Sequence, residues 1–231
     1  MTTVVMLPGM DGSGTLFDDF IKELGAKTLV IAYPPHRPLG YEALAALVEE
    51  QLPRDDDVIV LGESFSGPIA ILLASKQLPN LRAVVLICTF AKMRDRPGPA
   101  LLRWLICRLP FWRMPVRLGA PALLGSGDTP ALREKLLNAV RVVRSDVWRT
   151  RMGAILSVDV TPQLRNVRVP MLYLQASEDR IVPPRAASML KQAHANVEIK
   201  VIPGPHALLQ TQSKACALAL RSFARKHDIA L

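Results

Sequence analysis

The sequence contains no uninterrupted apolar run of the ~18 or more residues that span a bilayer, although half of its 231 residues are hydrophobic. Its first apolar segment, Thr3 to Leu7, is short and ends in Pro8-Gly9. It lacks the basic start and the small-residue cleavage site of a secretion signal. We therefore expect neither a transmembrane segment nor a signal peptide. The apolar content is sufficient for one well-packed domain, and the length alone permits one or two.

Cysteine is scarce, with three residues scattered in apolar surroundings, Cys88, Cys107 and Cys216. An odd number cannot all pair, and this usage is typical of reduced, buried thiols in a cytoplasmic protein. No group of residues has the spacing of metal ligands. We expect a cytoplasmic protein that needs no metal and no cofactor.

The chain carries a net charge of +9, and this excess is confined to one internal segment. Residues 91–165 hold fourteen Lys and Arg against five Asp and Glu, whereas the remaining residues hold fifteen of each. The location of the positive charge is therefore more informative than its total.

Short apolar runs alternate with helix-period segments, a pattern that predicts βαβ units and an α/β fold with a mostly parallel sheet of about six strands and helices on both faces. We expect strands near Thr3–Pro8, Lys27–Tyr33, Asp57–Leu61, Arg82–Thr89, Val169–Gln175 and Val197–Ile202. We expect helices near Leu16–Leu24, Tyr41–Gln51, Ser66–Leu78, Arg185–Ala193 and Ala207–Lys226.

The alternation stops at Ala91 and resumes after Arg165, which predicts a core of residues 1–90 and 166–231 interrupted by a helical, basic insertion of residues 91–165. One helix within it starts at Pro130, a residue favoured at the first helical position. Its apolar face continues to Val147, and a second face carries Arg141, Arg144, Trp148 and Arg151.

A serine lies where one predicted strand turns into a helix, in Val58-Ile-Val-Leu-Gly-Glu-Ser-Phe-Ser-Gly67. A serine at such a turn has a strained backbone that projects its hydroxyl above the sheet, and small residues are needed two positions before and after it. Gly62 and Ser66 meet this need, although the strict motif has glycine at the second place. The pattern predicts that Ser64 is a nucleophile; alternatively, Ser64 only caps the helix.

A serine nucleophile needs a base, and the base needs an orienting acid. In this architecture they follow the serine in the order acid, histidine, on loops after later strands. Asp179 follows the strand ending at Gln175, and His206 follows the next strand. Of the four histidines, only His206 follows a strand at the carboxyl edge of the sheet. Glu178 competes for the acid role, but the run that starts at Asp179 leads out of the loop into the next helix.

Two backbone N–H groups are needed to bind an oxyanion. We assign them to Phe65, directly after the nucleophile, and to Met10 in the turn Leu7-Pro-Gly-Met-Asp-Gly-Ser-Gly14. This turn lacks the Gly-Lys-Ser/Thr ending of a phosphate-binding loop and the glycine spacing of a dinucleotide-binding turn.

These residues together resemble the α/β-hydrolase superfamily over nearly the whole chain. Pro8-Gly9-Met10 takes the place of the family's usual His-Gly-X oxyanion motif, and the matches to its elbow, acid and base are Ser64, Asp179 and His206. Two departures are the missing histidine before Gly9 and the serine at position 66. The resemblance implies a hydrolase fold that lacks the first two strands, with residues 91–165 as a lid over the active site.

The lid suggests two features of the substrate. Its apolar residues favour an acyl chain or another hydrophobic ester group, unless they only pack onto the core: Leu101, Leu102, Trp104, Leu105, Phe111 and Trp112. Its arginines form either a solvated face or a site for an acidic partner: Arg94, Arg96, Arg103, Arg108, Arg113 and Arg117. That partner would be acyl carrier protein, coenzyme A or anionic lipid. The construction is similar to that of the small lidded esterases that act on pimeloyl-carrier-protein methyl ester, and this resemblance makes that class worth testing. Nucleic acid is not expected, because the charge lies where a lid should be.

The sequence therefore predicts a serine hydrolase that cleaves a small carboxylic ester or thioester through an acyl-enzyme. A thioesterase or acyltransferase with the same triad is the alternative. A third hypothesis is a binding protein that kept the fold and lost its activity. Epoxide hydrolase or dehalogenase chemistry would require Asp at the position of Ser64.

Overall fold

The apolar segments form one parallel sheet in the computed structural model, which describes residues 1–93 and 116–231 (the side chains of 116–118 excepted). Its strands are β1 (Thr2–Leu7), β2 (Thr28–Val30), β3 (Asp57–Glu63), β4 (Leu81–Ile87), β5 (Met171–Ala176) and β6 (Val197–Ile202). They lie in the order β2-β1-β3-β4-β5-β6, and every neighbouring pair is parallel. The predicted six-stranded parallel sheet is confirmed, although β2 is shorter than expected.

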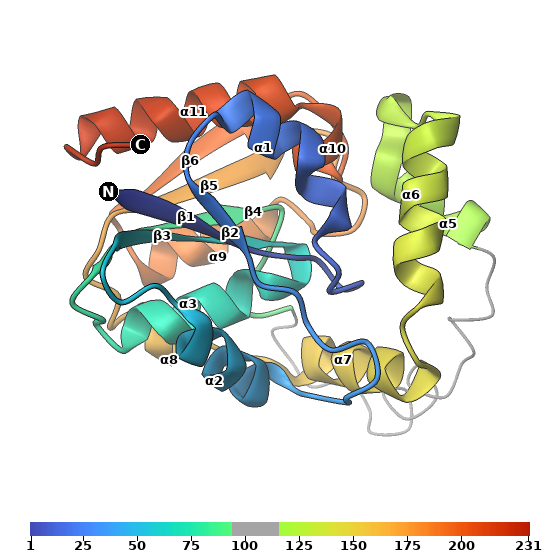
Figure 1. The fold of residues 1–231 in the computed structure, drawn as a ribbon, viewed down its shortest axis with the longest axis horizontal. Coiled ribbons are helices and arrows are strands. Elements are labelled where there is room, and N and C mark those ends of the chain that lie inside the picture. Colours follow the sequence, from blue (N-terminus) through green and yellow to red (C-terminus); the bar gives the residue numbers. More distant parts are fainter. Residues whose placement is uncertain (94–115) are drawn as a thin grey trace.

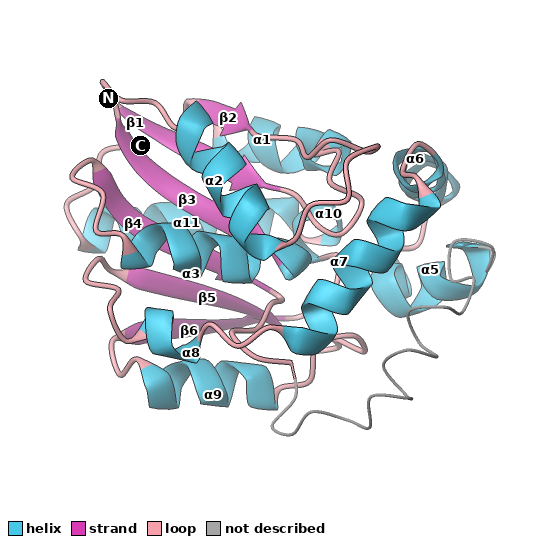
Figure 2. Cartoon of the chain, turned by 90° about the horizontal axis from the view of Figure 1, so that it is seen from below, coloured by secondary structure: helices cyan, strands magenta, loops and turns pink. Residues whose placement is uncertain are grey.

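Helices cover both faces of this sheet (Figures 1 and 2). One face is covered by α1 (Asp18–Leu24) and α11 (Ser213–Lys226), and the other by α2 (Tyr41–Gln51), α3 (Gly67–Ser75), α8 (Thr161–Leu164) and α9 (Arg185–Ala193). Successive side chains of a strand point to opposite faces. Val5 therefore belongs to the core under α2 and α3, while Val4 and Met6 belong to the core under α1 and α11.

Three longer helices lie beyond the carboxyl end of β1 (Figure 1). They are α5 (Val116–Leu124), α6 (Pro130–Arg141) and α7 (Ser145–Ser157). The short helix α10 (Leu208–Thr211) directly precedes α11. The apolar lid residues named above, and the arginines from Arg94 to Arg113, lie outside the described residues, as does the side chain of Arg117. Within the described part of the chain, no helix is long and apolar enough to cross a membrane.

The helix expected to run from Pro130 past Val147 is in fact two helices. Arg144 lies in the break, where its amide donates a hydrogen bond to the carbonyl of Pro35, 2.9 Å away. The preceding residues are Val142 and Val143, whose β-branched side chains do little to maintain a helix. Val143 is buried and Val142 is 62% exposed. A tertiary contact therefore divides a segment whose apolar spacing alone indicated one helix.

The single helix expected over Ala207–Lys226 is also divided, at Gln212, which leaves the helical region with φ −132°. The hydroxyls on either side of it bond back along the chain. Thr211 donates to the carbonyl of Ala207 at 2.8 Å, and Ser213 donates to that of Leu209 at 2.7 Å. Such side-chain bonds to a carbonyl four residues earlier bend helices.

Candidate active site

A pocket opens at the carboxyl ends of the central strands. The chain passes from β1 outward to β2 on one side and then returns to β3 on the other side of β1, so the direction of winding reverses between β1 and β3. Ligands bind at such switch points of parallel sheets. The pocket has a volume of about 650 Å³, including space open to solvent. It is lined by turns of the core (Gly9, Met10, Asp11, Leu16, Glu63, Ser64, His206, Ala207, Gln210) and by α5, α6 and α7 (Leu123, Leu124, Leu132, Leu136, Val140, Trp148).

Ser64 stands at the sharp turn between β3 and α3, with a backbone φ of +49°. A side chain rarely adopts this left-handed region without surrounding support. The support includes close packing at Gly62, where an added Cβ would lie 2.7 Å from the carbonyl oxygen of Ser66. The turn thus has the strained geometry that the sequence pattern predicts.

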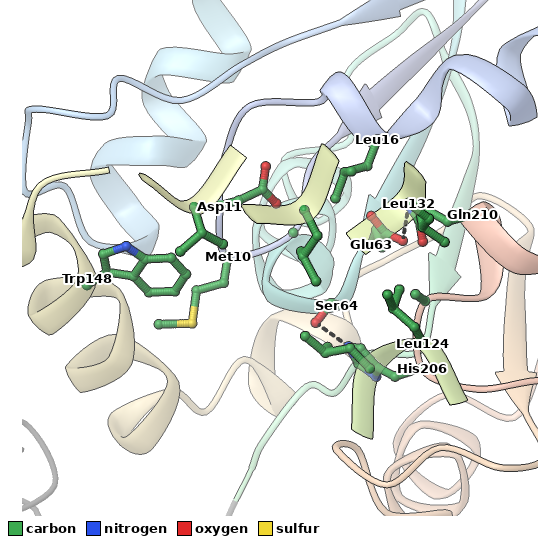
Figure 3. A pocket seen from close by; sticks show the side chains of 15 residues that line it. Met10, Asp11, Leu16, Glu63, Ser64, Leu124, Leu132, Trp148, His206 and Gln210 are labelled. Carbon is green, nitrogen blue, oxygen red and sulfur yellow. Dashed lines mark hydrogen bonds between the residues drawn. The ribbon is translucent and has the colours of Figure 1, made fainter. Parts of the chain in front are cut away.

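Three of the predicted site residues meet in one hydrogen-bonded chain (Figure 3 shows its first link). The Oγ of Ser64 lies 2.8 Å from Nε2 of His206. Nδ1 of His206 lies 2.8 Å from Oδ2 and 3.0 Å from Oδ1 of Asp179. The carboxylate that reaches the imidazole is therefore that of Asp179, while Glu178 is exposed. His206 itself is buried, at 5% exposure.

Asp179 is fixed in its ionised form by its surroundings. Burial alone would raise the pKa of this carboxyl, but the hydrogen bond and charge of His206, together with two backbone hydrogen bonds, outweigh burial. The amides of Ile181 and Val182 also donate to Oδ1, each at 2.8 Å. The net pKa is below its ordinary value, because several donors favour the carboxylate. Asp179 can therefore hold the imidazole in one tautomer.

Cys88 lies beside this carboxylate, and its sulfur and one ligand atom each of Asp179 and His206 lie within 4.8 Å of one another. A metal ligand would have to be the thiolate. Burial, followed by the charge of Asp179, raises the pKa of Cys88 well above its usual value. The carboxylate of Asp179 and the imidazole of His206 already bind each other.

The turn after β1 is held at three successive carbonyls. Ser66 donates its hydroxyl hydrogen to the carbonyl of Pro8, and Tyr33 lies 2.6 Å from the same Ser66 Oγ. The amide of Gly12 donates to the carbonyl of Gly9 at 3.0 Å. The third carbonyl, that of Met10, accepts from Nη1 of Arg151 at 2.7 Å. Because a trans peptide points its N–H opposite to its C=O, the bond to Gly9 also fixes the direction of the Met10 amide.

The Phe65 amide is oriented in the same way. The hydroxyl of Thr89 donates to the carbonyl of Ser64, which belongs to the same peptide group as the Phe65 N–H. Thr89 approaches this closely because residue 67 is glycine: a Cβ there would lie 2.0 Å from Thr89 Oγ1. The peptide plane then directs the Phe65 N–H away from Thr89.

Sequence reasoning missed Arg151, which it assigned to a polar helix face. The side chain is 1% exposed, its guanidinium lies 5.7 Å from the ring centre of Tyr33, and Nη2 donates to the carbonyl of Pro34 at 3.4 Å. Burial lowers the pKa of Arg151, while the charge of Asp11 opposes that effect. The arginine connects α7 directly to the turn that contains Met10.

Sequence reasoning also missed Glu63 and Gln210, which line the pocket beside Ser64 (Figure 3). Nε2 of Gln210 donates to Oε1 of Glu63 at 3.0 Å. Burial raises the pKa of Glu63 to about 8, partly opposed by the Gln210 hydrogen bond. The only sequence signal was a carboxylic acid at the variable position of the Gly-x-Ser turn.

The model of the alpha/beta hydrolase family matches residues 4–219. The pimeloyl-[acyl-carrier protein] methyl ester esterase of Neisseria meningitidis serogroup C is 25% identical over 238 residues, covering 95% of this chain and 92% of the relative. RutD of Caulobacter sp. (strain K31), provisionally named a carbamate hydrolase, is 23% identical over 245 residues, covering 96% and 90%. Esterase EaEST from Exiguobacterium antarcticum superposes with a TM-score of 0.83 at 17% identity, covering 97% of this chain and 92% of that one.

The parallel sheet, the left-handed backbone conformation of Ser64 and the family match all indicate the same fold family. The chain belongs to the alpha/beta hydrolase family, as the resemblance drawn from its residues predicted. It is an enzyme of the hydrolase class, and relatives of similar length are named as hydrolases and esterases.

Proposed function

We propose that the protein cleaves a carboxylic ester by a Ser-His-Asp mechanism with an acyl-enzyme intermediate. The observation that carries the proposal is the hydrogen-bonded chain from Ser64 through His206 to Asp179. A nucleophile and base within about 2.6–3.2 Å, with the base oriented by a third group, is the geometry this chemistry needs.

In the proposed reaction, Ser64 Oγ attacks the ester carbonyl while Nε2 of His206 takes its proton. The imidazolium then returns that proton to the departing alcohol oxygen, and the C–O bond breaks to leave an acyl-serine. Asp179 fixes the tautomer and stabilises the positive ring. Water, deprotonated by His206, attacks the acyl-serine. The imidazolium then returns the proton to Ser64 Oγ as the acyl C–O bond breaks, which releases the acid and restores the enzyme.

The negative oxygen that forms at each attack is assigned to the amides of Met10 and Phe65. Both amides belong to peptide groups whose carbonyls are already anchored, by Gly12 and by Thr89. A donor that is oriented before the reaction loses no free energy to reorganisation when the charge develops. These anchors therefore support the assignment of the oxyanion hole.

The substrate class follows from the side chains that line the pocket. Apart from the polar groups near Ser64, the lining consists mainly of leucine, valine and tryptophan from α5, α6 and α7. Such a surface suits an acyl group of moderate length. We propose residues 91–165 as the lid, because α5, α6 and α7 within this segment supply that surface.

The proposal of an acidic carrier protein or anionic lipid at the lid rests mainly on arginines outside the described residues. Several lid cations that the structure describes already have partners in the chain. Arg133 pairs with Asp128 and Arg144 with Asp146, while Lys135 pairs with Asp18 of the core. The named substrate of the Neisseria relative favours a carrier-bound ester. If a carrier binds, kcat/KM for a carrier-bound ester should fall steeply with salt, while that of a small neutral ester stays constant. Equal salt dependence would contradict this part of the proposal.

A thioesterase or an acyltransferase would use the same residues, with a thiol as leaving group or an alcohol in place of water. Product analysis with competing alcohols separates transfer from hydrolysis. A binding protein without activity would hydrolyse neither ester nor thioester.

The experiment that tests the proposed function is hydrolysis of p-nitrophenyl esters of increasing acyl length by the native protein and by Ser64→Ala. We expect kcat to fall by about 10³-fold or more in the variant. The preferred acyl length would indicate how long an acyl group the pocket accommodates. Equal rates in both proteins would contradict Ser64 as the nucleophile, and no turnover of any ester by the native protein would contradict esterase activity.

A further inference from the structure

The pocket beside Ser64 is lined by two carboxyl groups that the proposed mechanism does not use, those of Asp11 and Glu63, and of these two only Glu63 is buried. Glu63 is 7% exposed, and its side chain lines the pocket. One oxygen, Oε1, accepts a hydrogen bond from Gln210. The other, Oε2, has no hydrogen-bond partner among residues 1–93 and 116–231 and lies 3.9 Å from the position a Cβ would take on Gly9. Glu63 thus presents one free oxygen next to the turn that carries Met10.

The groups around Glu63 keep its carboxyl neutral near pH 7. Burial raises its pKa to about 8, and the negative charge of Asp11 adds to this effect. Since Oε1 accepts from Gln210, the proton of the neutral acid belongs on Oε2. A neutral acid donates a hydrogen bond, whereas a carboxylate only accepts.

We propose that Glu63 is a specificity-determining residue, whose Oε2–H binds an oxygen acceptor in the acyl group of the substrate. Glu63 thereby selects esters whose acyl group carries a carbonyl, hydroxyl or ether oxygen near the scissile bond, and it disfavours plain alkyl esters. The inference rests on the proposed function. Gln210 acts as the positioning residue, because its bond engages Oε1 and leaves Oε2 available to a ligand. An alkyl group there would leave a buried polar oxygen unpaired, which disfavours it. The surrounding leucines bind the rest of the chain.

The test compares acyl groups of equal size with and without one ether oxygen. The p-nitrophenyl esters are butanoate with methoxyacetate, pentanoate with 3-methoxypropanoate, and hexanoate with 4-methoxybutanoate. Each rate is divided by that of hydroxide hydrolysis, which removes intrinsic reactivity. We expect the native enzyme to favour the ether by about fivefold or more in kcat/KM for at least one pair.

Two variants separate recognition from structural support. Glu63→Gln keeps a donor of the same size and should retain the ether preference, whereas Glu63→Leu should reverse it. In the native enzyme the preference should decline above about pH 8 as the carboxyl ionises, while Glu63→Gln should show no such decline. If Glu63 only supported the fold, both members of each pair would slow equally. An ether-to-alkyl ratio that is the same in the native enzyme and Glu63→Leu for all three pairs would overturn the inference.

Binding in the Ser64→Ala background tests the inference without turnover. Calorimetry should show that this variant binds methyl esters of the preferred ether acyl group more tightly than the alkyl analogue, and that adding Glu63→Leu removes the difference. Equal binding of both esters by Ser64→Ala would contradict the role of Glu63 but would leave the proposed function unaffected. Undiminished hydrolysis by Ser64→Ala would contradict the proposed function instead.

Discussion

Arg151 and Met10 lie far apart in the sequence, yet Nη1 of Arg151 donates a hydrogen bond to the carbonyl oxygen of Met10 at 2.7 Å. This contact joins α7 to the turn after β1. Gly12 allows it, because an added Cβ at residue 12 would lie 2.7 Å from the same nitrogen. A helix outside the core thus helps to hold the turn to which we assign an oxyanion donor.

Replacing Arg151 by methionine should lower kcat by about tenfold to a hundredfold with little change in KM, because oxyanion donors act mainly in the transition state. Arg151→Lys, which keeps one charged donor, should recover part of the loss. Arg141→Met is the matched control, since Arg141 is an exposed arginine at the end of α6. The measurement is steady-state kinetics on a p-nitrophenyl ester, after circular dichroism has shown that each variant is folded. A native kcat in Arg151→Met would contradict this role.

Replacing Ser66 by alanine should lower the free energy of unfolding by about 1–3 kcal/mol, because it leaves the buried Tyr33 hydroxyl and the Pro8 carbonyl without their partner. Urea denaturation measures the effect. Ser157→Ala is the control: this hydroxyl bonds only to carbonyls of its own helix at an exposed position, and its loss should cost less than about 0.5 kcal/mol. Equal stability of Ser66→Ala and the native protein would contradict the role of Ser66 as a link between the two turns.

Replacing Gly62 by alanine should abolish most activity and destabilise the fold by about 1–3 kcal/mol, since the new Cβ would lie 2.7 Å from the Ser66 carbonyl and 3.0 Å from the Ala70 Cβ. Gly40→Ala tests whether any glycine substitution has this effect, because nothing lies within 4 Å of a Cβ there. Thermal unfolding and ester hydrolysis of both variants provide the comparison. Activity retained in Gly62→Ala would mean that the turn tolerates a larger residue.

Glu63 should make stability depend on pH. Its folded pKa of about 8 lies above the ordinary value of 4.5, so between these pH values the folded state holds a proton that the unfolded state has lost. The contribution of the Glu63 carboxyl to the free energy of unfolding is fully present below about pH 4.5 and is lost as the pH rises toward 8. Glu63→Gln removes this dependence and should become more stable relative to the native protein, by up to a few kcal/mol at pH 8. A difference in unfolding free energy that is constant from pH 5 to 8 would contradict a neutral Glu63.

Local sequence patterns predicted the elements that depend on local periodicity. Both Tyr41–Gln51 and Val197–Ile202 have the expected bounds. The pattern also predicted that Ser64, Asp179 and His206 would follow three different strands, and the parallel sheet brings them together. Their chemical roles, like those of Met10 and Phe65, remain predictions until they are tested by mutation.

The parts that the sequence did not reveal depend on contacts between distant segments. The contact between Arg144 and Pro35 breaks a helix that its apolar spacing made continuous. Arg151 looked like a surface residue because its partner, a backbone carbonyl, has no signature in the sequence. The acid at position 63 is bound by Gln210, which lies 147 residues later, and such a contact has no local signature in the sequence.

The most direct test of the central claim is to label the protein with a fluorophosphonate and locate the adduct by peptide mass spectrometry. We expect one adduct, on Ser64, that is absent from Ser64→Ala and forms far more slowly in Asp179→Asn, in which the imidazole is held in the wrong tautomer. Labelling of a different residue, or of Ser64→Ala at the native rate, would contradict the account.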